Sequence, residues 1–139
     1  MNASALKAAL CEGVFEAQLT ALYGADSLAA QTERYLAAID AFVAQFGDRD
    51  DLCLFSVPGR TEVSGNHTDH NRGKVLAAAV DLDILAVCAR REDTKITVAS
   101  AGYPIDSISY DRREVVESER FTSRAILRGT CDAFARRGM

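Results

Sequence analysis

Tryptophan is absent from this chain of 139 residues, and aromatic residues make up only 7% of it. Proteins that bind nucleic acid commonly combine a basic stripe with aromatic side chains on which bases stack. The net charge of this chain is −4, and its arginines form only short pairs such as Arg90-Arg91 and Arg112-Arg113. The composition therefore argues against nucleic acid as a partner.

Long apolar runs are also missing, since no stretch approaches the about 18 residues that a membrane-spanning helix needs. The beginning of the chain has no signal-peptide pattern, and the four cysteines include no Cys-x-x-Cys pair, which argues against a disulfide framework and a zinc knuckle. We therefore expect a protein of the reducing cytoplasm that is not embedded in a membrane. Cys53, Cys88 and Cys131 are expected to be buried as small apolar residues.

A hydrophobic content of 48% is sufficient for a core, and the length is that of about one domain. Apolar residues at helical spacing predict two or three helices over residues 1–51, with a break at 24–27, and a further amphipathic helix over 121–136. Short apolar runs predict strands over residues 52–57, 75–80, 83–89, 95–100 and 105–110. The short connections between these strands predict an α+β fold with a mixed, mostly antiparallel sheet.

Both histidines of the chain lie in one polar, glycine-bounded segment between two expected strands. This segment reads Pro58-Gly59-Arg60-Thr61-Glu62-Val63-Ser64-Gly65-Asn66-His67-Thr68-Asp69-His70-Asn71-Arg72-Gly73. Pro58-Gly59 predicts a turn, and Gly59 and Gly65 are interpreted as positions where the backbone needs glycine. Arg60 offers a planar fork of donors, and Asp69 offers two acceptor oxygens. Together with the amide and imidazole groups nearby, they suit a polyhydroxylated ligand such as a sugar.

A metal site is the alternative for this segment, because His67, Asp69 and His70 lie within four residues. The chain has no third histidine and no nearby cysteine to complete such a site. We therefore predict no metal ligands in this chain. The alternative role for Asp69 is capping of the loop.

The pattern Gly59-Arg60-x-x-x-x-Gly65-x-His67-Thr68-Asp69-x-Asn71-x-Gly73 resembles the N-terminal signature of galactokinases. These enzymes belong to a superfamily of sugar and small-metabolite kinases with homoserine and mevalonate kinases. The resemblance implies a fold like domain 2 of ribosomal protein S5 and transfer of the ATP γ-phosphate to the 1-hydroxyl of galactose. It also implies that Arg60 is a catalytic and sugar-binding residue. Asn66, His67 and Asp69 are implied as further sugar-binding residues.

Two residues depart from the family's pattern: Glu62 replaces an asparagine, and Asn66 replaces a glutamate. Residues 60 and 62 of a strand share a face, so we predict that Glu62 supports Arg60 through an ion pair. The departures leave two alternatives open. One is a sugar sensor or regulator that has lost turnover, and the other is a sister kinase for N-acetylgalactosamine or arabinose.

The family's motifs for ATP and Mg²⁺ are missing from these 139 residues. The sequence contains no Gly-Ser-Gly-Leu-Ser-Ser-Ser-type phosphate loop and no later segment with the family's catalytic aspartate. The resemblance therefore implies that residues 1–139 are the N-terminal, sugar-binding part of a galactokinase and are inactive alone. We also expect this part to self-associate, because the rest of a galactokinase would cover some of its apolar surface.

Overall fold

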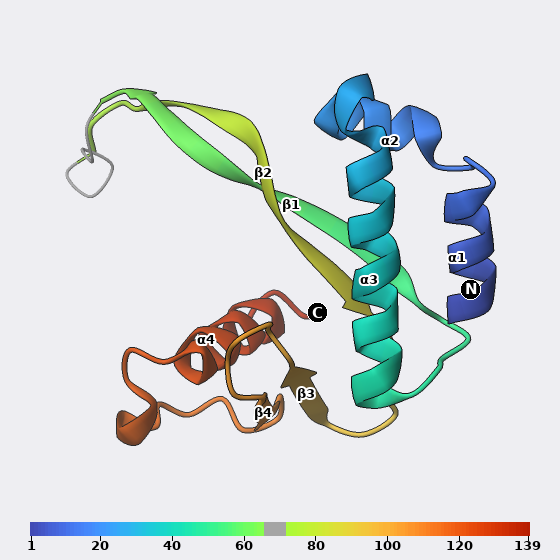
Figure 1. Cartoon of the computed structure of the whole chain (residues 1–139). Coiled ribbons are helices and arrows are strands. Elements are labelled where there is room, and N and C mark those ends of the chain that lie inside the picture. The colour runs from blue at the N-terminus through green and yellow to red at the C-terminus, as the bar shows by residue number, and fades with distance from the viewer. Residues whose placement is uncertain (66–71) are drawn as a thin grey trace. The chain divides into compact units, whose positions relative to one another are not determined.

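A computed structural model of the chain, which describes residues 1–65 and 72–139, divides into two compact units (Figure 1). Met1–Arg90 contains the helices α1 (Ala3–Cys11), α2 (Glu16–Tyr23) and α3 (Leu28–Phe46), the short helix η1 (Ala25–Ser27), and the strands β1 (Cys53–Ser64) and β2 (Leu76–Cys88). Arg91–Met139 contains the strands β3 (Lys95–Val98) and β4 (Asp106–Ser109), the short helix η3 (Glu117–Glu119) and the helix α4 (Ser123–Ala135). The α+β class predicted from the sequence is confirmed.

The helical part of the first unit agrees with the predicted pattern, with one additional break. Three helices occupy residues 3–46, and α2 and α3 end at Gly24 and Gly47, where the sequence predicted ends. A turn around Gly13 also separates α1 from α2. Asn2 caps α1, because its side-chain oxygen accepts a hydrogen bond of 2.9 Å from the backbone N–H of Ala5.

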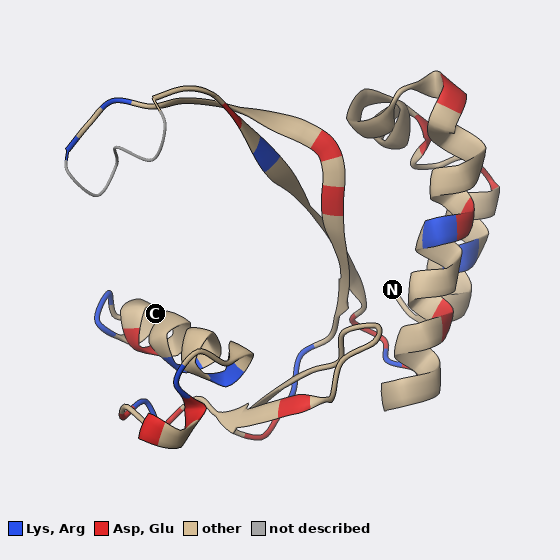
Figure 2. Ribbon diagram, turned by 60° about the vertical axis from the view of Figure 1, so that its left-hand side comes forward, with Lys and Arg blue, Asp and Glu red and all other residues tan. Residues whose placement is uncertain are grey.

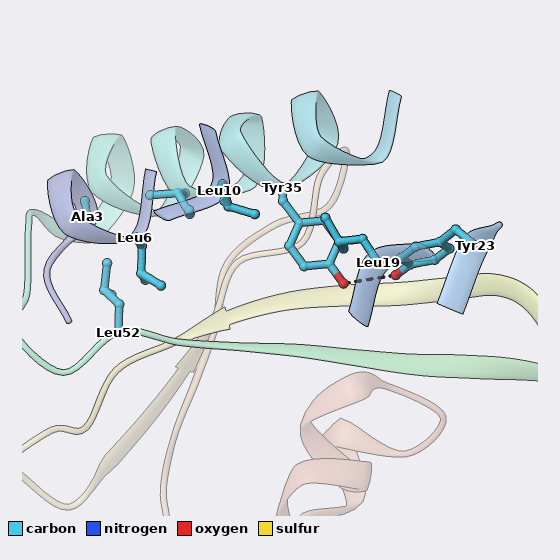
Figure 3. Packing of buried hydrophobic residues seen from close by; sticks show 8 residues of the cluster. Ala3, Leu6, Leu10, Leu19, Tyr23, Tyr35 and Leu52 are labelled. Atoms are coloured by element: carbon cyan, nitrogen blue, oxygen red, sulfur yellow. Dashed lines mark hydrogen bonds between the residues drawn. The ribbon is translucent and has the colours of Figure 1, made fainter. Parts of the chain in front are cut away.

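The core of the first unit lies between these helices and the first half of the β1–β2 hairpin (Figure 3). Ile39 is fully buried at its centre. Burial of one such side chain contributes about 1.5–3 kcal/mol to folding. Figure 3 shows seven further buried residues by name: Ala3, Leu6, Leu10, Leu19, Tyr23, Tyr35 and Leu52. Leu54, Leu85 and Val87 of the hairpin pack against the same cluster.

The strands correct three predictions. The expected turn at Pro58-Gly59 is wrong, because β1 continues to Ser64 and only shifts its register between Pro58 and Arg60. Proline lacks a backbone donor and is tolerated at such an irregularity. The expected separate strands over 75–80 and 83–89 are a single strand, β2, although Asp81 and Asp83 interrupt its apolar run. The expected single sheet is likewise two antiparallel sheets of two strands each, β1-β2 and β3-β4.

The second unit is built on the β3–β4 hairpin and α4. The hairpin pairs Lys95 with Ser109 at one end and Val98 with Asp106 at the other. Asp106 connects the hairpin to α4, since its carboxylate accepts hydrogen bonds from Ser123 and from Nε of Arg124, the latter at 2.9 Å. Both predicted strands and the helix predicted over 121–136 are therefore present, and each end lies within two residues of its expected position.

The cysteines are more exposed than the sequence suggested. Cys53 and Cys88 are exposed and Cys131 is half-buried, so the prediction of buried thiols is wrong. The reason lies in the alternation of the strand: Leu54 of β1 faces the helices, and the residues on either side of it point away from them.

Charges of both signs occur throughout the two units. In Figure 2, basic and acidic residues are both found along the helices of the first unit and again in the second. No helix in the part of the chain that the structure describes has the length and apolarity required to cross a membrane.

Candidate functional site

The candidate site is the half of the β1–β2 hairpin in which residues 60–64 pair with residues 76–79, where the polar segment begins. Arg60, Thr61 and Glu62 pair in an unbroken register with Ala79, Ala78 and Ala77. Arg60 and Glu62 therefore share one face of the strand, as predicted, with only alanine methyl groups opposite them. Both side chains are exposed. Arg60 is exposed to solvent, so a ligand can reach its guanidinium.

The backbone at Gly65 lies very close to the facing segment of the hairpin at Lys74 and Val75. This residue adopts a φ of +119°, which side-chain-bearing residues rarely do, and a Cβ atom there would lie 2.7 Å from the carbonyl oxygen of Lys74. Glycine is therefore required at position 65, which confirms its interpretation as a backbone device. The requirement is weaker at Gly59, which has no positive φ and where a Cβ atom would lie 3.0 Å from the carbonyl oxygen of Leu82.

Three predicted sugar-binding residues follow Gly65 in the sequence. Asn66, His67 and Asp69 lie in the segment 66–71, outside the described residues. Their roles therefore stay predictions. Of the described residues that flank this segment, Gly65 lies close to Lys74 and Val75, since a Cβ atom at position 65 would lie 2.7 Å from atoms of both.

Arg60 lies on strand β1, where it shares one face of the strand with Glu62. The supporting role of Glu62 stays a prediction, for which the shared strand face is the structural basis. Arg60 itself presents five N–H donors in a planar fork, which matches the oxygens of a sugar or a phosphoryl group.

A buried polar cluster that the sequence analysis missed holds the inner half of the hairpin to the helices. At its centre, the Asp83 side chain on β2 is only 2% exposed. Its Oδ1 accepts a hydrogen bond of 2.6 Å from Nη1 of Arg34 on α3. Its Oδ2 accepts hydrogen bonds from the hydroxyl of Tyr23 at 2.6 Å and from Oγ of Ser56 at 2.5 Å. Tyr35 completes the cluster, with its hydroxyl 3.0 Å from that of Tyr23.

The hydrogen-bond directions in this cluster follow from the number of protons available. Each hydroxyl has one proton, and those of Tyr23 and Ser56 are used on the carboxylate, so Tyr35 donates to Tyr23. Burial alone would raise the pKa of Asp83, but hydrogen bonds from Ser56, Tyr23 and Arg34 together outweigh it and hold this pKa below its ordinary value. Burial also raises the pKa of Tyr35, and the hydrogen bond with Tyr23 adds to the rise. The cluster is therefore an ionised carboxylate surrounded by neutral hydroxyls and one guanidinium.

This cluster lies next to the candidate site along the chain. Asp83 pairs with Pro58 across the hairpin, and Arg60 follows after the register shift. A sequence signal for the cluster exists, because an aspartate between Leu82 and Ile84 in an apolar strand needs a buried partner if it faces the core. The partners Tyr23 and Arg34 are distant in sequence, so the signal does not identify them.

The described residues at this site offer the Arg60 guanidinium as a cation and donor and the Glu62 carboxylate as an acceptor. Within residues 1–65 and 72–139, no three His, Cys, Asp or Glu side chains lie close enough together to hold a metal ion.

In the comparison with known proteins, the segment that contains this hairpin matches a family model. Residues 40–90 match a family model described as the galactokinase galactose-binding signature. The galactokinase of Ligilactobacillus salivarius is 32% identical over 83 residues, which cover 54% of this chain and 21% of that protein. The galactokinase of Enterococcus faecalis is 38% identical over 65 residues, covering 47% of this chain and 16% of that protein.

A third relative, the galactokinase of Lactococcus lactis subsp. lactis, is 30% identical over 95 residues, covering 67% of this chain and 24% of that protein. The chain thus spans a quarter or less of the length of these curated relatives. No solved structure matches it, so the S5-like fold stays a prediction. Residues 40–90 therefore match the galactokinase galactose-binding signature, and over part of its length the chain is similar to galactokinases.

Proposed function

We propose that this chain provides the sugar-binding part of a galactokinase-type phosphotransferase, which moves the γ-phosphate of ATP to the 1-hydroxyl of galactose. The observation that carries this proposal is the match of residues 40–90 to the galactose-binding signature. The fold supports it, since those residues include the hairpin that presents Arg60 opposite short alanines. A location in the cytoplasm is part of the proposal.

In this reaction the 1-hydroxyl oxygen of galactose attacks the γ-phosphorus, the bond from phosphorus to the β,γ-bridging oxygen breaks, and ADP leaves. Negative charge is spread over the oxygens of the transferred group in the transition state, where a fixed cation stabilises it. We assign that role to Arg60. We assign galactose hydroxyls to Asn66, His67 and Asp69, and a supporting role to Glu62.

Phosphoryl transfer also needs a cradle for the phosphates, a metal ion and a residue that positions the nucleophile. We assign none of these functions to residues 1–139, because the sequence has no phosphate loop of the family type. ATP and Mg²⁺ would therefore bind to other residues of the enzyme.

Glu62 and Asn66 favour a second candidate function. Both replace residues of the family's sugar signature, and a sugar-binding protein that has lost turnover would tolerate such changes. A sensor would bind galactose without transferring phosphate, whereas a sister kinase would phosphorylate N-acetylgalactosamine or arabinose instead. Measuring phosphorylation and binding for all three sugars separates these outcomes.

We predict that residues 1–139 alone do not phosphorylate galactose and that they self-associate. Large apolar side chains are exposed on the hairpin, including Val57 at 58%, Ile84 at 73% and Leu82 at 78%, and exposed patches of this kind favour association. The test compares this chain with a chimera in which residues 1–139 replace the matching part of the L. salivarius galactokinase. Galactose phosphorylation is measured by ADP release, and mass by light scattering.

The chimera is the control for both readouts, because it supplies the remaining motifs and any surface that would cover the hairpin. Turnover of galactose by residues 1–139 alone would contradict the predicted inactivity. A strictly monomeric chain at concentrations of tens of micromolar would contradict the predicted self-association. A chimera that binds galactose and releases no ADP would favour the sensor.

A further inference from the structure

We propose that Cys53 and Cys88 form a cross-strand dithiol site, which a small-molecule disulfide such as glutathione disulfide oxidises reversibly to an intramolecular disulfide. The two cysteines are direct partners in the antiparallel register of β1 and β2. Both are exposed to solvent. The proposal does not depend on the kinase function, since it concerns the opposite end of the hairpin from Arg60.

The strand geometry brings the two thiols close to bonding distance. Directly opposed residues of an antiparallel pair have Cα atoms about 4.5–5.5 Å apart and Cβ atoms about 4.5–5.5 Å apart. A disulfide requires Cα atoms within about 4.4–6.8 Å and Cβ atoms within about 3.5–4.5 Å. Bonding therefore needs only a small inward movement of the two Cβ atoms, with no change in strand register.

A polar clamp next to the cysteines maintains that register. The Arg49 guanidinium donates a hydrogen bond of 2.9 Å to the carbonyl oxygen of Arg90. The backbone N–H of Arg90 donates another of 2.9 Å to the Asp51 carboxylate. These contacts tie together the chain segments that enter β1 and leave β2, so the ends of the strands do not separate easily. The Cys53 thiol also donates to the carbonyl oxygen of Asp51 at 3.6 Å.

The thiols influence each other electrostatically, which agrees with their juxtaposition. The pKa of Cys88 is raised, chiefly by loss of solvent around its thiol and further by the neighbouring Cys53. Two adjacent thiolates repel each other, and a disulfide removes that repulsion. A metal ion bridging the two thiols is not favoured, because the described part of the chain provides no third ligand among its His, Cys, Asp and Glu side chains.

The oxidation proceeds by two thiol–disulfide exchanges. The thiolate of one cysteine attacks a sulfur of glutathione disulfide, forms a mixed disulfide and releases one glutathione thiolate. The thiolate of the second cysteine then attacks the protein sulfur of the mixed disulfide and releases the second glutathione. Two protein thiols and one glutathione disulfide thus give one protein disulfide and two glutathione molecules, and a dithiol reductant reverses the change.

Tryptic mass spectrometry tests the proposal directly, because trypsin separates all four cysteines. Cys53 lies in the peptide 50–60 and Cys88 in the peptide 75–90, each with no other cysteine. The full chain is treated with glutathione disulfide, its remaining thiols are alkylated, and it is digested. The expected product is the two peptides joined, with the loss of two hydrogen atoms. Glutathione adducts on Cys53 and Cys88 as the stable end products would overturn the proposal.

Matched variants show whether the link is specific. Cys11→Ser with Cys131→Ser should retain the joined peptides, whereas Cys53→Ser should abolish them and leave Cys88 as a glutathione adduct. Oxidation of the Cys11→Ser, Cys131→Ser chain should also raise the melting temperature of the first unit by about 5 °C or more, because a cross-link restricts the unfolded chain. Equal linkage of Cys53 to Cys11 or Cys131 in the unmodified chain would contradict a preformed site.

Discussion

Replacing Arg60 by alanine in the galactokinase chimera should lower kcat for galactose at least tenfold, which corresponds to about 1.4 kcal/mol of transition-state stabilisation. The physical reason is the loss of a fixed positive charge where negative charge accumulates on the transferred phosphoryl group. The KM for ATP should change less. Arg60 lies exposed on β1 opposite Ala79, so its removal should leave the packing of the hairpin intact.

Two variants make this prediction sharper. Arg60→Lys keeps the charge and loses the planar fork, so it should recover only part of the activity. Arg90→Ala is the matched control, because the contacts of Arg90 with Arg49 and Asp51 use its backbone atoms and its side chain is exposed. An Arg60→Ala chimera that turns over galactose as fast as the Arg90→Ala control would remove Arg60 from the catalytic site.

Replacing Asp83 by alanine should destabilise the first unit by about 3 kcal/mol. Removal of one partner from a buried ion pair costs about 3–5 kcal/mol, and the lower value applies because the Arg34 side chain is 37% exposed. The hydroxyls of Tyr23 and Ser56 would also lose their acceptor. Urea unfolding of residues 1–139, followed by circular dichroism of the helices, measures the change.

Asp40→Asn is the control for that measurement. Asp40 forms an ion pair of 2.6 Å with Lys7 in the same unit, but its side chain is 63% exposed, and such surface pairs contribute about 0–1 kcal/mol. If Asp83→Ala were no more destabilising than Asp40→Asn, the buried cluster would not anchor the hairpin.

The same cluster should make the first unit sensitive to acid. The folded-state pKa of Asp83 lies below its ordinary value of 3.8. The carboxylate therefore contributes its full stabilisation above that ordinary value and loses it as the pH falls through the lower folded-state value. Asp83→Asn should be less stable than the unmodified chain at neutral pH, and the difference should shrink below about pH 4.

The sequence was sufficient for the elements that depend on local patterns. Apolar residues at helical spacing and the glycines at positions 24 and 47 predicted the helices, and β4 and α4 appear near their expected ends. Pro58-Gly59 was misleading, because its turn propensity is overridden by the pairing of β1 with β2 through Ser64. That pairing connects residues far apart in the chain, and local patterns contain no information about it.

The sequence predicted only part of the candidate site. The period of a strand predicted that Arg60 and Glu62 share a face, and the register of β1 agrees, although the sequence analysis predicted a strand only as far as residue 57. The Asp83 cluster was not predicted, because its members come from α2, α3, β1 and β2 and meet only after the helices pack on the hairpin. The exposure of Cys53 and Cys88 was also missed, since apolar neighbours in a strand do not reveal which face each residue occupies.

Identification of the product made by the chimera tests the proposed function most directly. The chimera is incubated with ATP, Mg²⁺ and galactose, and the phosphorylated sugar is characterised by ³¹P and ¹H nuclear magnetic resonance. We predict a single phosphomonoester on the 1-hydroxyl of galactose, formed at least tenfold more slowly by the Arg60→Ala chimera. A folded chimera that forms no sugar phosphate, or that places the phosphate on another hydroxyl, would contradict the assignment of this chain to galactose 1-phosphorylation.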